Sequence, residues 1–308
     1  MKEMTIVTGT TPTIRLSNNV ELPVLGLGVY LSSPGDTANA VQRAIARGYR
    51  LIDTASAYGN EREVGAGIAR SGVRRDELFV TTKLWIGEYG YDRALRAFDE
   101  SLKKLGVDYL DLYLLHWPAP SGWNQTIAAW QAAKTLLADG RVRAIGVCNF
   151  KEPHLKRLIA ETGVAPLVNQ VELHPYFSQP DLRQANAQLG IATQAWSPIG
   201  GTYSNHPRDP GRVTRLLDDP ALTEIASRID KTPAQAVLRW HVQNGVSAIP
   251  KSVHPERIAS NIDIFDFELS DADMGSITAL DTGRRNGSDP EEFDLAFLAA
   301  RQRQQKGA

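Results

Sequence analysis

Residues 78–116 read LFVTTKLWIGEYGYDRALRAFDESLKKLGVDYLDLYLLH. Two runs rich in aliphatic and β-branched residues, 78–83 and 110–116, stand on either side of an amphipathic segment at 93–104. The apolar residues of that segment recur every three or four positions, and Gly106 follows it as a helix stop. A strand, a helix and a second strand in this order predict two parallel strands joined by a right-handed crossover.

The same alternation extends along the chain in both directions. Two helix candidates precede the last strand candidate, and two follow it. Eight strand–helix units predict an α/β fold, a closed (β/α)8 TIM barrel, with a doubly wound open sheet as the alternative. The strand candidates are residues 24–28, 51–53, 78–83, 110–116, 144–149, 167–170, 192–196 and 247–250. The helix candidates are residues 37–47, 61–69, 93–104, 127–137, 152–160, 179–188, 221–229, 233–242, 255–261 and 271–280.

The first part of the chain departs from this alternation. Residues 13–16 and 20–23 flank Ser17, Asn18 and Asn19, and asparagine tolerates the positive φ angles of tight turns. We therefore predict a β-hairpin ahead of the barrel. No linker or low-complexity stretch divides the sequence, so we expect one barrel domain over residues 1–308.

The composition excludes several classes of protein. The 308 residues include 34 basic and 35 acidic side chains, and a net charge of −1 gives no field that would attract nucleic acid or an anionic membrane. No apolar run approaches the ~20 residues that span a bilayer, and no signal-peptide pattern is present. Cys148 is the only cysteine and the histidines show no ligand spacing, so we expect no disulfide and no metal. We expect a cytoplasmic monomer.

Polar residues end most of the strand candidates. In a closed parallel barrel these ends all lie at the C-terminal mouth, where active sites of this fold are built. For any one of these residues taken alone, the simpler interpretation is that it is polar because the strand reaches solvent there. Their common position along the strands instead indicates one shared site. The residues are Asp53, Lys83, His116, Asn149, Gln170 and, directly after the last strand candidate, Lys251.

Four of the side chains expected at this mouth are suited to proton transfer. Tyr58 lies five residues after Asp53, in the loop that leads away from the same strand end. A nearby Lys83 ammonium would favour the phenolate and lower the pKa of Tyr58 from about 10. We predict Tyr58 as the acid, Lys83 as the group that tunes it, Asp53 as the partner of Lys83, and His116 as the group that steers a substrate oxygen.

A phosphate site is predicted after the last strand candidate. The sequence contains neither GxGxxG nor GxxxxGK[ST], so a Rossmann dinucleotide site is not expected. Lys251, Ser252 and Arg257 can all donate to phosphate oxygens, and a helix that begins near Pro255 would add its dipole. A solvated basic loop is the alternative interpretation.

Three stretches of this sequence resemble the signatures of the aldo-keto reductases, and the similarity covers nearly the full chain. Residues 48–61 read GYRLIDTASAYGNE, residues 110–118 read LDLYLLHWP, and residues 249–252 read IPKS, followed by Arg257 and Asn261. Residues 231–241, KTPAQAVLRWH, and residues 265–269, FDFEL, are similar to the prokaryotic 2,5-diketo-D-gluconate reductase branch.

The resemblance implies a barrel whose bottom is closed by the hairpin and whose mouth binds extended NADPH, with NADH as a weaker alternative. It implies reversible reduction of aldehydes, ketones or diketones to alcohols by hydride transfer, with Tyr58 as proton donor. The implied catalytic residues are Asp53, Tyr58, Lys83 and His116. The implied cofactor contacts are Gly28, Val29 and Tyr30, Asn149 and Gln170 at the nicotinamide carboxamide, Trp196 on the nicotinamide face, Ser197, Pro198 and Ile199 over the pyrophosphate, Lys251, Ser252, Val253 and Arg257 around the 2′-phosphate, and Asn261 at the adenine.

Aromatic residues are expected to form the walls of the substrate pocket. A small-molecule carbonyl compound is the expected partner, and aromatic walls favour aromatic or medium aliphatic substrates. The residues expected to contact it are Tyr30, Tyr58, Trp85, His116 and Trp117, with Trp123 as a further candidate. We expect one more wall from the tail after Gly283, through Phe293 or Phe297, and disorder in residues 301–306.

Three positions depart from the family pattern. His254 stands where close relatives often carry Arg or Thr, and Ser260 stands where many carry Glu. Cys148 stands where the family usually has Ser. We therefore expect weaker contacts to the adenosine end of the cofactor and one weaker hydrogen bond to its carboxamide.

Two other functions fit part of the pattern. A class I aldolase also uses a lysine at a barrel strand end, as a Schiff base, and Lys83 could serve. An aldolase has no need, however, of Trp196 or of the anion site from Lys251 to Arg257. A non-catalytic binding module is the second alternative, since some chains that resemble this family are regulatory subunits of membrane channels.

Overall fold

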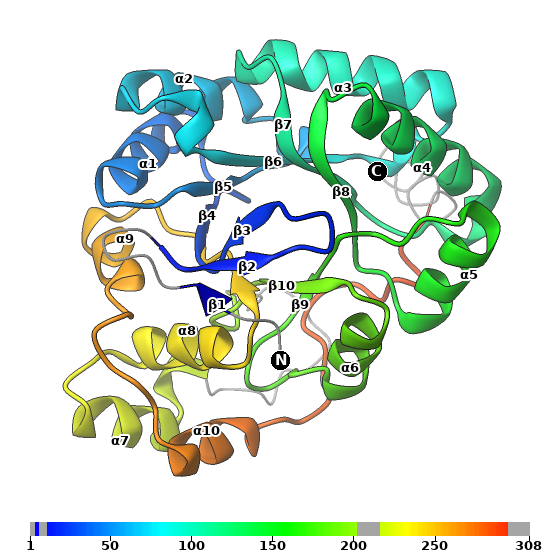
Figure 1. The fold of residues 1–308 in the computed structure, drawn as a ribbon. Helices are drawn as coiled ribbons and strands as arrows, with labels where there is room; N and C mark the ends of the chain where they lie inside the picture. The colour runs from blue at the N-terminus through cyan, green and yellow to red at the C-terminus, as the bar shows by residue number, and fades with distance from the viewer. Residues whose placement is uncertain (1–3, 6–10, 202–215, 295–308) are drawn as a thin grey trace, which may run out of the picture.

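Eight parallel strands close into a barrel in the computed structural model, which describes residues 4–5, 11–201 and 216–294 (Figure 1). Each strand pairs with the next along the chain, and parallel bridges from Leu25 to Ala248 and from Gly28 to Lys251 join the first strand to the last. The predicted (β/α)8 barrel is therefore confirmed, and the open sheet was wrong. The strands are β4 (Gly26–Gly28), β5 (Leu51–Asp53), β6 (Phe79–Leu84), β7 (Leu110–Leu115), β8 (Val142–Cys148), β9 (Val168–Glu172), β10 (Ala192–Trp196) and β11 (Ser247–Ala248).

Helices surround this barrel (Figure 1). Their positions follow the predicted segments, and most differ from them by only a few residues at an end. At α1, for example, the helix begins at Pro34 and not at residue 37, because Ser33 caps it: the Ser33 hydroxyl accepts the backbone N–H of Asp36 at 3.2 Å. The helices are α1 (Pro34–Ala46), α2 (Glu61–Ser71), α3 (Tyr91–Leu105), α4 (Trp123–Ala138), α5 (Glu152–Thr162), α6 (Pro180–Gln188), α7 (Pro220–Arg228), α8 (Pro233–Gln243), α9 (Pro255–Ile262) and α10 (Asp271–Thr278).

The predicted hairpin lies across the end of the barrel where the strands begin. It consists of β2 (Thr13–Arg15) and β3 (Glu21–Pro23), with β1 (Met4–Thr5) paired to β2 as an addition that the sequence did not predict. Its turn contains Asn19 at φ 67°, and Asn18 Nδ2 donates to the carbonyl of Arg143 near the start of β8. Figure 1 shows the hairpin in blue in front of the barrel. The opposite end of the barrel, where the strands finish, is not covered by the hairpin.

One carboxylate interrupts the apolar interior near the start of the strands. Asp111 of β7 is fully buried, and its two oxygens meet the guanidinium groups of Arg75 and Arg143 at 2.7 Å each. It also accepts the backbone N–H of Val80 at 2.9 Å. These contacts satisfy the charge, so Asp111 stabilises the barrel wall and leaves the polar strand ends at the opposite side to form the site. No helix within the described ranges is long and apolar enough to cross a membrane.

Candidate active site

A buried ion pair forms where β5 and β6 end. Asp53 is the last residue of β5, and its Oδ1 lies 2.5 Å from the Nζ of Lys83 on β6. The ammonium also donates to the carbonyl of Thr54 at 2.9 Å and to the hydroxyl of Tyr58 at 3.4 Å. Asp53 and Lys83 are almost completely excluded from solvent. The structure thus brings three of the four predicted catalytic side chains into one hydrogen-bonded group.

The loop after β5 holds Tyr58 in place. A short 3₁₀ turn, Ser56–Tyr58, ends at Gly59, whose φ of 70° suits glycine. The Ser56 hydroxyl donates to the carbonyl of Lys83 at 2.9 Å, which fastens the turn to β6. Asn60 Nδ2 donates to the carbonyl of Val29, which fastens the other end of the loop to the segment after β4. The half-buried Tyr58 ring is therefore fixed with its hydroxyl beside the ammonium.

His116 completes the group from the end of β7. Its ring centroid lies 5.8 Å from that of Tyr58 and 5.3 Å from that of Trp85, with the planes steeply inclined in both pairs. Its Nδ1 is buried and has no hydrogen-bond partner among the described residues. Burial, and secondarily the charge of Lys83, lowers the pKa of His116 well below its usual value. The imidazole is therefore neutral at neutral pH.

The protonation of Tyr58 differs from the prediction. The Lys83 ammonium does act to lower the pKa of Tyr58, but burial acts more strongly, so the pKa lies above the usual value of 10. Burial would also favour a neutral Lys83, yet Asp53 and Tyr58 outweigh it and raise the pKa of Lys83. Burial raises the pKa of Asp53, and Lys83 opposes that rise. At neutral pH the tyrosine therefore holds its proton and the lysine its charge.

This charge state distinguishes between the candidate reactions. A Schiff base requires a neutral, nucleophilic lysine, which enzymes obtain by lowering its pKa. The raised pKa of Lys83 and its 2.5 Å contact with Asp53 give the opposite situation. A protonated phenol next to a fixed cation suits proton donation to an oxygen that is gaining negative charge. The aldolase hypothesis therefore loses its chemical basis at Lys83.

Gln170 lies inside the barrel below the ion pair. Its Nε2 donates to Oδ2 of Asp53 and to Oε1 of Gln194, at 2.8 Å each. Its Oε1 accepts from the thiol of Cys148 at 3.5 Å. Burial raises the pKa of this thiol, so the cysteine is neutral. The structure thus shows that Gln170 supports the carboxylate that pairs with Lys83.

Asn149 and Trp196 are joined to each other at the ends of β8 and β10. Asn149 has a positive φ of 63°, and its Oδ1 accepts the indole N–H of Trp196 at 2.8 Å. Its Nδ2 donates to the carbonyl of His116 at 3.0 Å. Trp196 therefore has a fixed orientation and a half-buried ring, and Asn149 connects it to His116. Ser197 follows at φ 49°, and Pro198 accepts from Nε2 of His241 at 2.9 Å. The other two residues predicted for the pyrophosphate loop are half-buried, namely Ser197 and Ile199.

Aromatic side chains surround this site, as the sequence predicted. Tyr30 is 46% exposed, and its ring lies 4.9 Å from that of Tyr58. Phe293 from the tail stacks on Trp117, with ring centroids 4.2 Å apart, and meets Trp85 edge-on at 5.9 Å. The tail therefore does supply a wall. Phe297 and residues 301–306, about which the sequence also made predictions, lie outside the described residues.

Trp123 is not part of this wall, so that prediction was wrong. Its ring packs near Phe150 and stacks with His154, and its indole N–H donates to Glu161 at 3.2 Å. The guanidinium of Arg157 covers the same ring at 4.7 Å. Trp123 therefore fastens α4 to α5 on the outside of the barrel.

The predicted phosphate site lies at the seam between β4 and β11. Gly28 donates its N–H to the carbonyl of Pro250 at 3.1 Å and bridges to Lys251. A side chain at Gly28 would come within 2.9 Å of the carbonyl oxygen of Ile249, which explains the glycine. Val29 donates its N–H to the carbonyl of Asp53 at 3.3 Å. The first strand thus connects the predicted phosphate site with Asp53 of the predicted catalytic group.

Two of the three donors of the predicted phosphate site, Lys251 and Arg257, are available for an anion. The side chains of Lys251 and Arg257 are exposed, and neither forms an ion pair within the part of the chain that the structure describes. Ser252 is buried and accepts the N–H of His254 at 3.1 Å, Val253 is half-buried, and Asn261 is buried on α9. A hollow of about 270 Å³ beside the start of α9 is lined by Arg43, Ala46, Arg47 and Pro255. Basic side chains therefore gather at this end of α9.

The sequence analysis missed one buried charge at the strand ends. Glu172, the last residue of β9, is fully buried and holds the tail: its Oε1 accepts the N–H of Asn286 at 2.6 Å, and its Oε2 accepts that of Gly287 at 2.9 Å. We call residues 285–293 the tail strap. Figure 1 shows this orange-red segment passing α6 on its way toward α5. The available signal was the position of Glu172, a charged residue at the end of a strand like Lys83.

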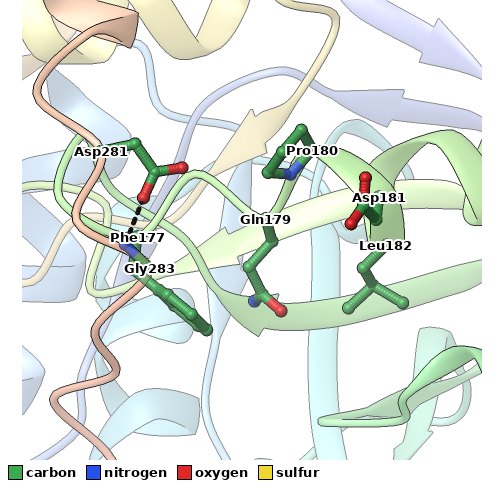
Figure 2. Close-up of a pocket in the computed structure, with 7 residues that line it drawn as sticks. All are labelled: Phe177, Gln179, Pro180, Asp181, Leu182, Asp281 and Gly283. Carbon is green, nitrogen blue, oxygen red and sulfur yellow. Dashed lines mark hydrogen bonds between the residues drawn. The ribbon is translucent and has the colours of Figure 1, made fainter.

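A second hollow, of about 250 Å³, lies at the start of α6 (Figure 2). It is placed between the start of α6 and the segment before the tail strap, where Asp281 accepts the N–H of Gly283 at 2.7 Å. No residue that the sequence analysis selected for the site lines it. Among the described residues, no three His, Cys, Asp or Glu side chains are grouped to hold a metal ion. The residues around it are Phe177, Gln179, Pro180, Asp181, Leu182, Asp281 and Gly283.

Comparisons with known proteins agree with this geometry. Residues 25–282 match the model of the Aldo/keto reductase family. Morphine 6-dehydrogenase of Pseudomonas putida is 57% identical over 94% of this chain and 98% of its own length. Glyoxal reductase of Bacillus subtilis (strain 168) is 46% identical over 91% and 97%. The crystal structure of a Bombyx mori aldo-keto reductase in complex with NADP superimposes with a TM-score of 0.85 at 35% identity, covering 94% of this chain and 99% of that one.

The match covers the barrel and all eight of its strands. The alignments with the two relatives cover nearly the whole length of each relative, so the similarity is not confined to one shared motif. The chain belongs to the aldo/keto reductase family, and it is an oxidoreductase.

Proposed function

We propose that this protein reduces aldehydes, ketones or diketones to alcohols reversibly, with NADPH as cofactor and Tyr58 as proton donor. Carbonyl reduction follows from its family and its reductase relatives. The observation that carries the proton-donor role is the contact of 3.4 Å between the Tyr58 hydroxyl and the Nζ of Lys83, with Asp53 fixed behind it.

The residues present fit NADPH at both ends. Lys251 and Arg257 present exposed cations beside the start of α9, which suits a phosphate group that NADH lacks. The half-buried ring of Trp196, oriented by Asn149, offers a flat face near the catalytic group. The nicotinamide of bound NADPH supplies the hydride, and the protein supplies orientation and charge. NADPH is the preferred cofactor, and NADH is the weaker alternative.

The chain's own groups divide the remaining work. The Tyr58 O–H donates its proton to the carbonyl oxygen as that oxygen gains negative charge. The Lys83 ammonium stabilises the phenolate that remains, and Asp53 keeps the ammonium in place. His116 is neutral, so it can orient the substrate oxygen through a hydrogen bond without adding a positive charge.

The surroundings of the site favour apolar carbonyl substrates. Tyr30, Trp85, Trp117 and Phe293 supply flat apolar surfaces around Tyr58 and His116. Among the similar proteins, one is named a morphine 6-dehydrogenase and another a glyoxal reductase, so substrates of different size are reported in the family. We place this protein's substrates among aldehydes, ketones and diketones.

The direct test is NADPH oxidation, followed at 340 nm, against a panel of aldehydes, ketones, diketones and keto sugars. Turnover of at least one class is expected. NADPH binding without any turnover would support the non-catalytic binding module instead. Borohydride trapping of a keto substrate on Lys83 would support the aldolase hypothesis, and no adduct is expected because the lysine is charged.

The rate of reduction should be nearly independent of pH from about pH 6 to pH 9. The pKa of Tyr58 is raised by burial, so the acid stays protonated, and the pKa of His116 is lowered by burial, so the imidazole stays neutral. The reverse reaction, alcohol oxidation, needs the phenolate and should accelerate as pH rises. Measurement of kcat in both directions tests this. A fall in the reduction rate between about pH 7 and pH 9 would show that Tyr58 loses its proton earlier than its burial implies.

Replacing Lys251 with methionine should raise KM for NADPH about 10- to 100-fold and leave KM for NADH nearly unchanged. A charge-assisted hydrogen bond to a phosphate contributes about 1.5–3 kcal/mol, and only NADPH carries the phosphate. Lys156→Met is the matched control, because Lys156 lies on the exposed face of α5 and pairs with Glu152. Steady-state kinetics with both cofactors would contradict the assignment if both lost affinity equally.

A further inference from the structure

The buried carboxylate of Glu172 accepts two backbone hydrogen bonds from the tail strap, one on each oxygen. Each oxygen accepts one backbone N–H of the strap, from Asn286 at 2.6 Å and from Gly287 at 2.9 Å. The Arg285 guanidinium lies 3.8 Å from Oε2, and His174 Nε2 lies 3.2 Å from Oε1. A buried carboxylate that loses its donors is strongly destabilised, so Glu172 holds the strap at this place.

The strap in turn contacts Trp196. A Cβ atom at Gly287 would come within 2.6 Å of Cη2 of the Trp196 indole and within 2.9 Å of Oε2 of Glu172. The strap backbone therefore lies directly against the indole and the carboxylate. On its other side, the indole N–H donates to Asn149 at 2.8 Å. Trp196 is thus held between the hydrogen bond to Asn149 and the strap backbone at Gly287.

A second, separate attachment holds the outer half of the strap. Lys151 Nζ lies 2.7 Å from Asp289 and 3.7 Å from Glu291, and His154 Nε2 lies 3.3 Å from Glu291. Beyond these ion pairs, Phe293 reaches the substrate wall at Trp117. The strap therefore has an inner attachment, at Glu172 next to Trp196, and an outer attachment, at Lys151 next to the substrate wall.

We propose that Glu172 is a positioning residue for the hydride-transfer site: by holding Gly287 against Trp196, it sets the place of the indole on which the nicotinamide stacks. The proposal rests on the proposed function, which assigns that stacking to Trp196. The inner attachment then governs cofactor binding, and the outer attachment governs substrate binding. One segment of chain thereby connects the two halves of the site.

Glu172→Gln is the nearly isosteric test of the inner attachment. A carboxamide has one oxygen and one NH₂ group, so in either orientation one strap N–H faces another donor. A hydrogen bond to a charged group is lost, and we expect the Kd for NADPH, measured by titration calorimetry, to rise about tenfold. A displaced indole also makes hydride transfer slower, so the deuterium isotope effect on kcat with [4-²H]NADPH should increase. A role in stability alone would leave that isotope effect unchanged.

Gly287→Ala provides a second variant should Glu172→Gln fold poorly. Its methyl group must displace either the indole or the strap, so the same rise in Kd and in isotope effect is expected. Gly275→Ala is the matched control, because a Cβ atom at that position in α10 meets nothing within 4 Å. Glu291→Gln weakens the outer attachment, and it should raise KM for the carbonyl substrate while leaving the Kd for NADPH within threefold of wild type.

The outcomes separate the two proposals. A rise of threefold or more in Kd for the folded inner variants, with the Gly275 and Glu291 variants unchanged, supports the positioning role. Changes below threefold in both Glu172→Gln and Gly287→Ala overturn it, and so does an equal rise in Glu291→Gln. If the wild-type protein binds NADPH and reduces carbonyl compounds in that experiment, the proposed function stands although the inference falls. Absence of NADPH binding by the wild type would remove both.

Discussion

Replacing Tyr58 with phenylalanine is expected to lower kcat for carbonyl reduction by about 10²- to 10⁴-fold, the usual contribution of a positioned general acid. The variant removes only the hydroxyl that lies 3.4 Å from Lys83 and keeps the ring that packs 4.9 Å from Tyr30. The NADPH dissociation constant should therefore stay nearly unchanged. Stopped-flow measurement of hydride transfer and a separate binding titration distinguish the two effects.

Tyr91→Phe is the matched control for this substitution. Tyr91 lies at the start of α3, and its hydroxyl contacts only Thr135 of α4 among the described residues, at 3.0 Å. Its loss should leave kcat unchanged. A Tyr58→Phe variant with near wild-type kcat would show that another group donates the proton.

Lys83→Met should also reduce turnover severely, for a different reason. The Tyr58 hydroxyl keeps its proton but loses the cation that stabilises the phenolate, so proton donation becomes harder. The pKa of Tyr58, already raised by burial, should rise further, because Lys83 is the group that lowers it. In the direction of alcohol oxidation, the rate profile should shift to higher pH. Measuring both directions separates this variant from a simple loss of folded protein.

The same substitution should destabilise the fold in a pH-dependent manner. It leaves the Asp53 carboxyl buried with Gln170 as its remaining side-chain donor, and breaking a buried ion pair on one side costs about 3–5 kcal/mol. Burial raises the pKa of Asp53, and without Lys83 nothing cationic opposes that rise. An acidic group whose pKa is raised in the folded state does not destabilise the fold below its unfolded pKa, because it is protonated in both states. It lowers the free energy of unfolding progressively as pH rises from the unfolded pKa through the folded pKa. The free energy of unfolding that Lys83→Met loses relative to the wild type should therefore be larger at pH 8 than at pH 5.

Urea denaturation at both pH values measures this deficit. The double variant Lys83→Met with Asp53→Asn is the control, because an amide has no charge to bury. It should recover most of the stability at pH 8 and none of the turnover. Full stability of the single variant at pH 8 would mean that the pair contributes little to folding.

The sequence allowed the barrel and the group of polar side chains at its mouth to be predicted for one physical reason. The strands of a closed barrel are buried on both faces, so they read as apolar runs, and a polar residue that ends such a run must face the mouth. Asp53, Lys83 and His116 all show this pattern, and the structure brings all three together. Local patterns were sufficient because each unit of strand and helix repeats the same geometry.

Other features depend on contacts that the local sequence does not contain. The sequence analysis placed the start of α4 near residue 127, whereas the helix begins at Trp123. The start was missed because the cap residue, Gly122, has no side chain and so leaves no capping signal in the sequence. The balance of burial against charge at Tyr58 required the folded environment, and without it the direction of the pKa shift was wrong. Glu172 bonds to residues more than a hundred positions away, so no spacing rule could pair it with the strap.

The seam that closes the barrel has a consequence for how the protein is made. β4 finds its second neighbour only in β11, more than 200 residues later in the chain. At a synthesis rate of roughly 5–20 residues per second, the ribosome needs about 10–45 s to produce the missing partner. During that time the edge of β4 offers unpaired backbone groups to any passing strand, which is a known route to aggregation. The edge of β4 is therefore the part of the nascent barrel that waits longest for its partner, until residues 247–251 have been made.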